Sequence, residues 1–352
     1  MAEKYLMKGN EALAEAAIRA GLEGYFGYPI TPQTEVLEYF SKHLPPKGIA
    51  YVQAESEVAA VNMVYGAAAC GKRIMTTTSS PGFSLMMEGV SYLACAEIPC
   101  VLVNIQRGGP GLGTIQPSQG DYFQAVKGGG HGDYNTIVLT PNSVQETADM
   151  VYKAFDLAEK YQNPVVILSD GALGQMMEKV EFKEDYVLPA KDISWATTGK
   201  TPDRKMNTVT SLYIQPEAME AKNFKLQAKY KLIKENEVDY ELYQMEDAQV
   251  ALVAFGLASR IAKKTVDLAR AKGIKVGLIR PKTVWPFPTE IIKHYSKQVK
   301  AYMTIEMNVG QMVEDVKLAV ECKIPVEHYG KVGGIVPSSE EIIAKVEGLL
   351  KS

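Results

Sequence analysis

Five residues of this 352-residue chain have hydroxyl, carboxylate or guanidinium side chains and stand where a β-strand is expected to end. They are Thr31, Glu57, Ser79, Ser80 and Arg107. Glu57 stands between a short β-prone run and a long apolar helical run, and carboxylates are rarely buried without a partner. A guanidinium binds a carboxylate with two parallel hydrogen bonds. Together these groups predict a crevice that holds a polar ligand with a carboxylate.

Two of these residues also have a purely structural explanation. Glu57 follows Ser56, and a serine N-cap with a carboxylate in the first turn stabilises a helix through its dipole. Arg107 could form an ion pair within the fold. A third residue, His131, could face the same crevice or cap a turn. The residue types alone leave each of these alternatives open.

The elements that must position these residues alternate between strands and helices over residues 1–190. The strands are expected at 24–28, 50–53, 73–78, 100–105, 136–140 and 164–170, and the helices at 9–21, 33–43, 58–69, 83–95 and 143–161. Continuous apolar strands separated by helices predict a doubly wound parallel α/β sheet. Ligands bind beyond the carboxyl ends of the strands in such sheets. The helix 58–69 is apolar on nearly every face, which predicts that it is buried.

The second half of the chain divides into a charged segment and another α/β region. Residues 191–248 are interpreted as a linker, with an exposed amphipathic helix whose apolar face carries Leu226, Tyr230 and Ile233. Strand–helix alternation resumes over residues 249–352. We therefore expect a second, smaller α/β domain there.

Composition excludes several classes of protein. A formal charge of −3 gives no basic surface for nucleic acid. No apolar run reaches the ~18 residues that span a bilayer, and the N-terminus lacks a signal-peptide core, so a cytoplasmic location is expected. The four cysteines lack cluster or CxxC spacing, and the histidines are isolated. No metal site is expected from this chain.

Two glycine-rich segments partly resemble nucleotide-binding motifs. Residues 66–73 nearly spell a phosphate loop, but they lack its Ser/Thr and end a helix instead of opening one. Residues 108–113 do not fit GxGxxG at the start of a helix, so a nicotinamide-binding fold is not indicated. The glycine-rich stretch 108–133 reads as a long loop, and loops of this length are usually functional or mobile.

At these residues the chain resembles the α subunit of 2-oxoacid:ferredoxin oxidoreductases over nearly its whole length. The matching motifs are Tyr28-Pro-Ile-Thr-Pro32, Gln53-Ala-Glu-Ser-Glu57, Arg107-Gly-Gly-Pro110, Lys127-Gly-Gly-Gly-His-Gly-Asp133 and Glu306-Met-Asn-Val-Gly-Gln311. The resemblance implies a thiamine-diphosphate pyrimidine-binding domain at 1–190 and a transketolase C-terminal-like domain at 249–352. It also implies a reaction, in which a 2-oxoacid and coenzyme A give acyl-CoA, carbon dioxide and reduced ferredoxin.

The resemblance assigns roles to the candidate residues. Glu57 matches the catalytic glutamate, which bonds the aminopyrimidine nitrogen of the cofactor and favours its imino tautomer. Thr31 and Arg107 match positions that contact the carboxyl end of the substrate. The remaining matches lie in turns that contact the cofactor, and these are Pro29, Ile30, Ser79 and Ser80.

The absence of a diphosphate-binding motif from this sequence implies a partner subunit. Thiamine enzymes hold the diphosphate and its Mg²⁺ with a Gly-Asp-Gly motif, and this sequence contains none. The resemblance therefore implies a β subunit that carries both the diphosphate site and a [4Fe–4S] cluster. Some members add γ and ferredoxin-like δ subunits.

The segment 111–122 looks most like the branched-chain (2-oxoisovalerate) type, with the 2-oxoglutarate type as the alternative. A few methylenes are worth only ~1–3 kcal/mol in a pocket, so the choice can depend on a few side chains. A subunit of a lipoamide-linked dehydrogenase and a non-catalytic scaffold are two further alternatives. The motifs at Thr31, Glu57 and Arg107 argue against both.

Overall fold

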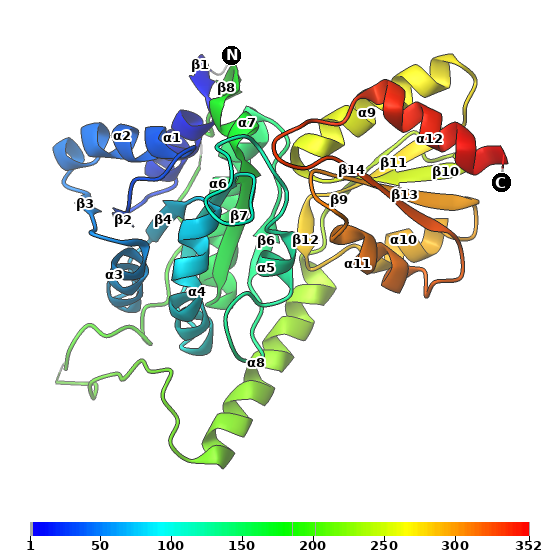
Figure 1. The fold of residues 1–352 in the computed structure, drawn as a ribbon. Coiled ribbons are helices and arrows are strands. Elements are labelled where there is room, and N and C mark those ends of the chain that lie inside the picture. The colour runs from blue at the N-terminus through cyan, green and yellow to red at the C-terminus, as the bar shows by residue number, and fades with distance from the viewer. Residues whose placement is uncertain (1–2, 185, 201, 352) are drawn as a thin grey trace.

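The computed structural model describes residues 3–184, 186–200 and 202–351. Within these ranges the chain forms two larger sheets, which lie side by side in Figure 1, and a small two-stranded sheet. The doubly wound α/β fold predicted from the sequence is confirmed. No helix of the described residues is long and apolar enough to cross a membrane.

The first sheet has the strand order β12-β6-β7-β5-β4-β2-β3 among the described residues, and every pairing except β12–β6 is parallel. Its strands are β2 (Gly24–Gly27), β3 (Ala50–Gln53), β4 (Ile74–Thr78), β5 (Cys100–Gln106), β6 (Ile137–Leu139), β7 (Pro164–Asp170) and β12 (Thr283–Trp285). The strands β4, β5, β6 and β7 are buried along their whole length, which explains the apolar runs of β5, β6 and β7.

Helices, several of which pack against one another in pairs, cover this sheet. They are α1 (Gly9–Arg19), α2 (Thr34–His43), α3 (Glu57–Ala69), α4 (Ser80–Cys95), α5 (Tyr122–Val126), α6 (Val144–Tyr161) and α7 (Gly171–Gln175), with a 3₁₀ turn η1 (Pro45–Lys47). Helix α1 packs against α6, and α3 packs against α4. The small antiparallel sheet pairs β1 (Lys4–Lys8) with β8 (Met177–Glu181).

Helix α3 differs from its prediction. It is not buried on every face, because Val58 is 44% exposed and Asn62 and Gly66 are also exposed. These residues are spaced four apart, so they form one stripe along the helix. The strand before it, β3, is the edge strand of the sheet, and nothing in the described chain packs on this stripe.

The second sheet has the order β14-β13-β10-β11-β9 among the described residues. Its elements are β9 (Tyr240–Tyr243), β10 (Val250–Val253), β11 (Val276–Pro281), β13 (Ala301–Glu306) and β14 (Val326–Gly330), with α9 (Gly256–Ala271), α10 (Thr289–Tyr295), α11 (Met312–Ala319) and α12 (Ser339–Lys351). Strand β9 comes from the segment predicted to be a linker, whereas β12 leaves this region and pairs with the first sheet. The second region thus contributes a strand to the first sheet.

Helix α8 (Pro216–Asn236) is the amphipathic helix expected in the linker, and it lies at the bottom of the view in Figure 1. Only Leu226, Tyr230 and Ile233 are buried, and these are the three residues predicted to form its apolar face. The spacing of four and three residues places them on one side of the helix.

One residue of the long glycine-rich loop is fixed by the second sheet. Gln119 is buried, and its backbone N–H donates to Met307 O over 3.1 Å while its carbonyl accepts from Asn308 Nδ2 over 2.8 Å. Its side chain accepts from Met307 N over 3.0 Å and donates to Phe255 O over 2.8 Å. All four polar groups of Gln119 therefore bind the second domain, so the loop that follows Arg107 is anchored at this point.

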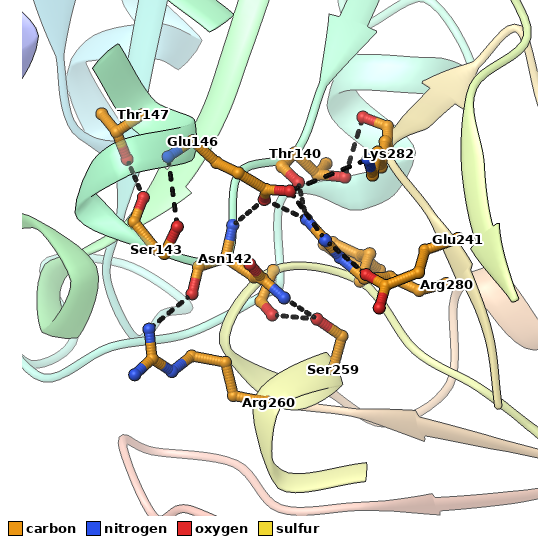
Figure 2. A network of polar contacts seen from close by, with 12 residues as sticks. Thr140, Asn142, Ser143, Glu146, Thr147, Glu241, Ser259, Arg260, Arg280 and Lys282 are labelled. Carbon is orange, nitrogen blue, oxygen red and sulfur yellow. Dashed lines mark hydrogen bonds and ion pairs between the residues drawn. The ribbon is translucent and has the colours of Figure 1, made fainter. Parts of the chain in front are cut away.

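A buried charge network also joins the two sheets (Figure 2). The Arg280 side chain is 2% exposed, and its Nη1 lies 2.9 Å from Glu146 Oε1 and 3.0 Å from Glu241 Oε2. Its Nη2 bonds the second oxygen of Glu146. Glu146 begins α6 of the first domain, whereas Arg280 and Glu241 belong to the second sheet. One guanidinium thus holds carboxylates of both domains.

Replacing Arg280 with Met should lower the free energy of unfolding by about 3–5 kcal/mol, because two partly buried carboxylates lose the buried guanidinium they share and keep only the more exposed Lys263 and Lys282. Chemical denaturation of the purified chain measures this change. The matched control is Arg260→Met, which breaks a more exposed pair with Glu178 and should cost only about 0–1 kcal/mol. Equal losses in the two variants would contradict the role given to Arg280.

Candidate active site

The structure brings all the predicted site residues to one edge of the first sheet. Strands β5, β4, β2 and β3 are neighbours in that order and run parallel. Arg107 follows β5, the two serines follow β4, Thr31 follows β2 and Glu57 follows β3. The candidate site residues therefore all follow the carboxyl ends of four adjacent strands.

Glu57 is a buried carboxylate in the first turn of α3, and it is 5% exposed. Ser56 is the N-cap and accepts a hydrogen bond from Ala59 N over 3.2 Å, as predicted. The Glu57 carboxylate itself makes no hydrogen bond or ion pair to any residue that the structure describes. It lies instead against Gly82 at the start of α4. Ser56 caps the helix, and the carboxylate is left for another partner.

Two hydroxyls near Glu57 are buried without a partner. Within the described chain, neither Thr78 Oγ1 nor Ser79 Oγ has a hydrogen-bonding partner. A Cβ atom added at Gly82 would lie 2.1 Å from Thr78 Oγ1 and 2.4 Å from Glu57 Oε1. Only glycine leaves room for both groups at this point. Buried polar groups without partners are costly, which indicates a polar ligand here.

Sequence analysis did not identify Thr78 or Gly82 as members of the site. Thr78 ends a strand that contains three consecutive threonines, and nothing in the sequence distinguishes the third from the others. Gly82 was read as part of a turn, although it lies in the first turn of α4. The contact with Glu57 depends on how α3 and α4 approach one another, and a local pattern does not carry that information.

Arg107 forms no ion pair with any described residue. The ion pair within the fold, which was the structural alternative for this residue, is therefore not observed. Its Nη1 donates to the backbone oxygen of Thr31 over 2.9 Å, and its Nε is buried without a partner. The backbone bond fixes the guanidinium beside the turn that follows β2. The remaining donors are available to an anion.

The turn after β2 carries the other predicted contacts. Pro29 and Thr31 are exposed, and Ile30 is half-buried. The Gln33 side chain holds the turn, because its Nε2 donates to Tyr28 O over 3.2 Å and its Oε1 accepts from Thr77 Oγ1 over 2.6 Å. These three exposed or half-buried residues are thus presented on a fixed loop.

The structure places Ser80 and His131 differently from the other candidate site residues. The Ser80 hydroxyl is engaged within the chain, since it donates to Asp121 Oδ2 over 2.5 Å and accepts from Arg107 N over 3.0 Å. His131 is exposed and lines a small cavity with Tyr92 that Glu57 does not line, and the alternative that it caps a turn stays a prediction. Among the described residues there is also no group of three or more His, Cys, Asp or Glu that could hold a metal ion.

Comparisons with known proteins agree with this arrangement. Residues 15–247 match the family model described as pyruvate flavodoxin/ferredoxin oxidoreductase, thiamine diphosphate-binding, and residues 248–342 match pyruvate:ferredoxin oxidoreductase core domain II. The chain is 51% identical to ketoisovalerate oxidoreductase subunit VorB of Methanothermobacter marburgensis, over 97% of this chain and 96% of that protein. It is 37% identical to 2-oxoglutarate synthase subunit KorA of the same organism, over 99% and 100%.

Solved structures also match this chain along nearly its whole length. A 2-oxoglutarate:ferredoxin oxidoreductase from Magnetococcus marinus, described with 2-oxoglutarate, coenzyme A and succinyl-CoA bound, matches with a TM-score of 0.88 and 30% identity. The match covers 99% of this chain and 66% of that one. A split-gene transketolase matches with a TM-score of 0.60 at 15% identity, which shows a shared fold alone.

Fold and site together define a subunit of a thiamine-diphosphate-binding oxidoreductase. The family matches make the assignment specific: the chain belongs to the pyruvate flavodoxin/ferredoxin oxidoreductase family, which includes the 2-oxoacid:ferredoxin oxidoreductases. The residues present fit the pyrimidine end of the cofactor, because an unpartnered buried carboxylate lies beside Gly82 and next to the orphaned hydroxyl of Thr78. The resemblance stated from the sequence is therefore confirmed.

Proposed function

We propose that this chain is the α subunit of a 2-oxoacid:ferredoxin oxidoreductase whose preferred substrate is 2-oxoisovalerate or another branched-chain 2-oxoacid. The complex would convert the oxoacid and coenzyme A to acyl-CoA and carbon dioxide, and the electrons would pass to ferredoxin. The observation that carries the proposal is the unpartnered Glu57 carboxylate, which lies at the same sheet edge as the unpaired Arg107 guanidinium.

Each residue has a task in this reaction. Glu57 would hold a proton at its carboxylate against the pyrimidine ring, and its burial excludes water from that contact. Arg107 would bind the carboxylate of the oxoacid, assisted by the Thr31 hydroxyl. Pro29, Ile30 and Ser79 would contact the cofactor, which supplies the nucleophilic carbon that attacks the keto group when it is bound. Ser80 would act indirectly, since its hydroxyl is used within the chain.

The choice of a branched-chain oxoacid is supported by two observations. The relative named for ketoisovalerate is 51% identical, against 37% for the relative named for 2-oxoglutarate. A second carboxylate on the substrate would need a cation, and residues 108–126 contain no Lys, Arg or His. Lys127 follows this segment but is ion-paired with Asp315. The same loop exposes Leu112 and Ile115, which suit an apolar side chain.

The proposal includes a partner that completes the site. A β subunit would carry the diphosphate site, its Mg²⁺ and the iron–sulfur cluster, and γ and δ subunits would complete a larger complex. The exposed apolar residues on α3 and α4 support such a partner, because Val58 on α3 and Leu85 on α4 are large and remain 44% and 54% exposed. The cytoplasmic location expected from the sequence stays a prediction.

Purification of the native complex tests the function. The complex should reduce a viologen dye with 2-oxoisovalerate and coenzyme A, and its kcat/KM for 2-oxoisovalerate should exceed that for 2-oxoglutarate. The opposite order would favour the 2-oxoglutarate alternative, and no reduction with any 2-oxoacid would reject the proposal.

The isolated chain should be colourless and inactive in the same assay. It contains neither a Gly-Asp-Gly motif nor cysteines at cluster spacing. Visible absorption and dye reduction should appear only after the β subunit is added. An iron–sulfur spectrum from the chain alone would show that the division of the site between subunits is wrong.

A further inference from the structure

Asp121 is a carboxylate in the site region that has no cation. It is the N-cap residue of α5, and one of its oxygens, Oδ2, accepts from Ser80 Oγ over 2.5 Å and from Asn104 Nδ2 over 2.9 Å. It forms no ion pair with any described residue. Burial raises the pKa of Asp121, and its bonds to Ser80 and Asn104 offset part of that effect. A partly buried carboxylate held only by neutral groups requires an explanation.

The bonds of Asp121 join three elements at one point. Asn104 lies in β5, Ser80 begins α4, and Asp121 precedes α5. Asn104 also accepts from the backbone of Ser80 over 2.9 Å, and the backbone of Asp121 donates to Gln106 Oε1 over 3.1 Å. The three side chains therefore close a ring of hydrogen bonds between the strand that leads to Arg107 and the helix that follows Thr78.

The carboxylate sets the direction of the serine hydroxyl. An ionised aspartate only accepts hydrogen bonds, so the single hydroxyl proton of Ser80 points to Asp121. The lone pair of Ser80 Oγ is then free to accept from Arg107 N, which lies 3.0 Å away. Arg107 is consequently held at two points, by Ser80 at its backbone and by Thr31 O at its guanidinium.

We infer that Asp121 is a positioning residue for the 2-oxoacid, acting through Ser80 on the backbone of Arg107. The inference rests on the proposed function, in which Arg107 binds the substrate carboxylate. Asp121 does not touch the substrate in this scheme. It fixes the point from which the guanidinium extends, so its loss should weaken binding of the oxoacid more than it slows the chemical step.

Kinetics of the assembled complex test the inference. Asp121→Ala and Ser80→Ala should each raise KM for the 2-oxoacid about tenfold, as expected for one lost hydrogen bond, with a smaller change in kcat. The double variant should be no worse than either single one, because both remove the same connection. Asp121→Asn should stay close to the wild type, since an amide oxygen can still accept both bonds.

A matched control separates positioning from stability. Ser143 caps α6 at the same edge of the sheet, where its Oγ accepts from Glu146 N over 3.1 Å, but it has no bond to Arg107. Ser143→Ala should lower the melting temperature and leave KM unchanged. The inhibition constant of the matching acylphosphonate, a mimic of the oxoacid, should rise in parallel with KM in Asp121→Ala.

The outcomes distinguish this inference from the function on which it rests. An unchanged KM in Asp121→Ala, or effects that multiply in the double variant, would overturn the role of Asp121 while the wild-type complex still turns over its oxoacid. A wild-type complex that accepts no 2-oxoacid would remove the proposed function and this inference together.

Discussion

Replacing Glu57 with Gln should leave the complex assembled and reduce its turnover by about a hundredfold or more. Glutamine has nearly the same shape, so the packing against Gly82 and the cap at Ser56 should survive. In the proposed role, the variant loses a carboxylate that would share a proton with the ring nitrogen of the cofactor. Steady-state turnover with a saturating 2-oxoacid and coenzyme A measures the effect.

A glutamate two residues earlier provides the control for this variant. Glu55 is exposed, and Glu55→Gln should keep wild-type turnover. Thermal unfolding of both variants should differ little from the wild type. If Glu57→Gln instead lowered the melting temperature and kept full turnover, Glu57 would be serving the helix and not the reaction.

Replacing Gly82 with Ala should have an effect of similar size for a different reason. The added Cβ would lie 2.1 Å from Thr78 Oγ1 and 2.4 Å from Glu57 Oε1, so the Glu57 side chain or α4 must move. Overpacking of this kind costs about 1–3 kcal/mol in stability. A displacement of about 1 Å at a reacting group can cost a hundredfold in rate, so we expect turnover to fall to that extent.

Gly348 offers a matched glycine-to-alanine control in helix α12. A Cβ atom there would meet no atom within 4 Å, so Gly348→Ala should leave turnover unchanged. A rise in the dissociation constant of thiamine diphosphate for Gly82→Ala, measured by calorimetry on the complex, would locate the damage at the pyrimidine end. Full activity of Gly82→Ala would mean that the crowded contact with Glu57 is not used.

The sequence predicted the strands and the positions of the site residues because both follow from local patterns. Strands β3 and β7 have the bounds expected from the sequence, and Glu57 and Arg107 lie at the predicted edge. Strand β12 was missed, since three residues carry too little periodicity to distinguish a strand from a loop. The resemblance supplied the roles, which residue types alone left open.

The rest of the site depends on contacts between distant segments. Asp121 and Ser80 are separated by the rest of helix α4, strand β5 and part of a loop, and Gln119 binds residues of the second domain. No spacing in the sequence indicates that these groups meet. The exposed stripe on α3 was mistaken for a buried surface because an apolar sequence does not distinguish packing within a chain from packing against another chain.

The pairing of β12 with the first sheet also constrains the order in which the chain can fold. The β12 strand completes one edge of the first sheet, yet it is synthesised only after β9, β10, α9 and β11 of the second sheet region. While the chain emerges from the ribosome, β6 must keep its outer backbone groups uncovered until β12 arrives, and an uncovered edge invites pairing with other chains. The first domain therefore completes its fold only after the second has begun to form.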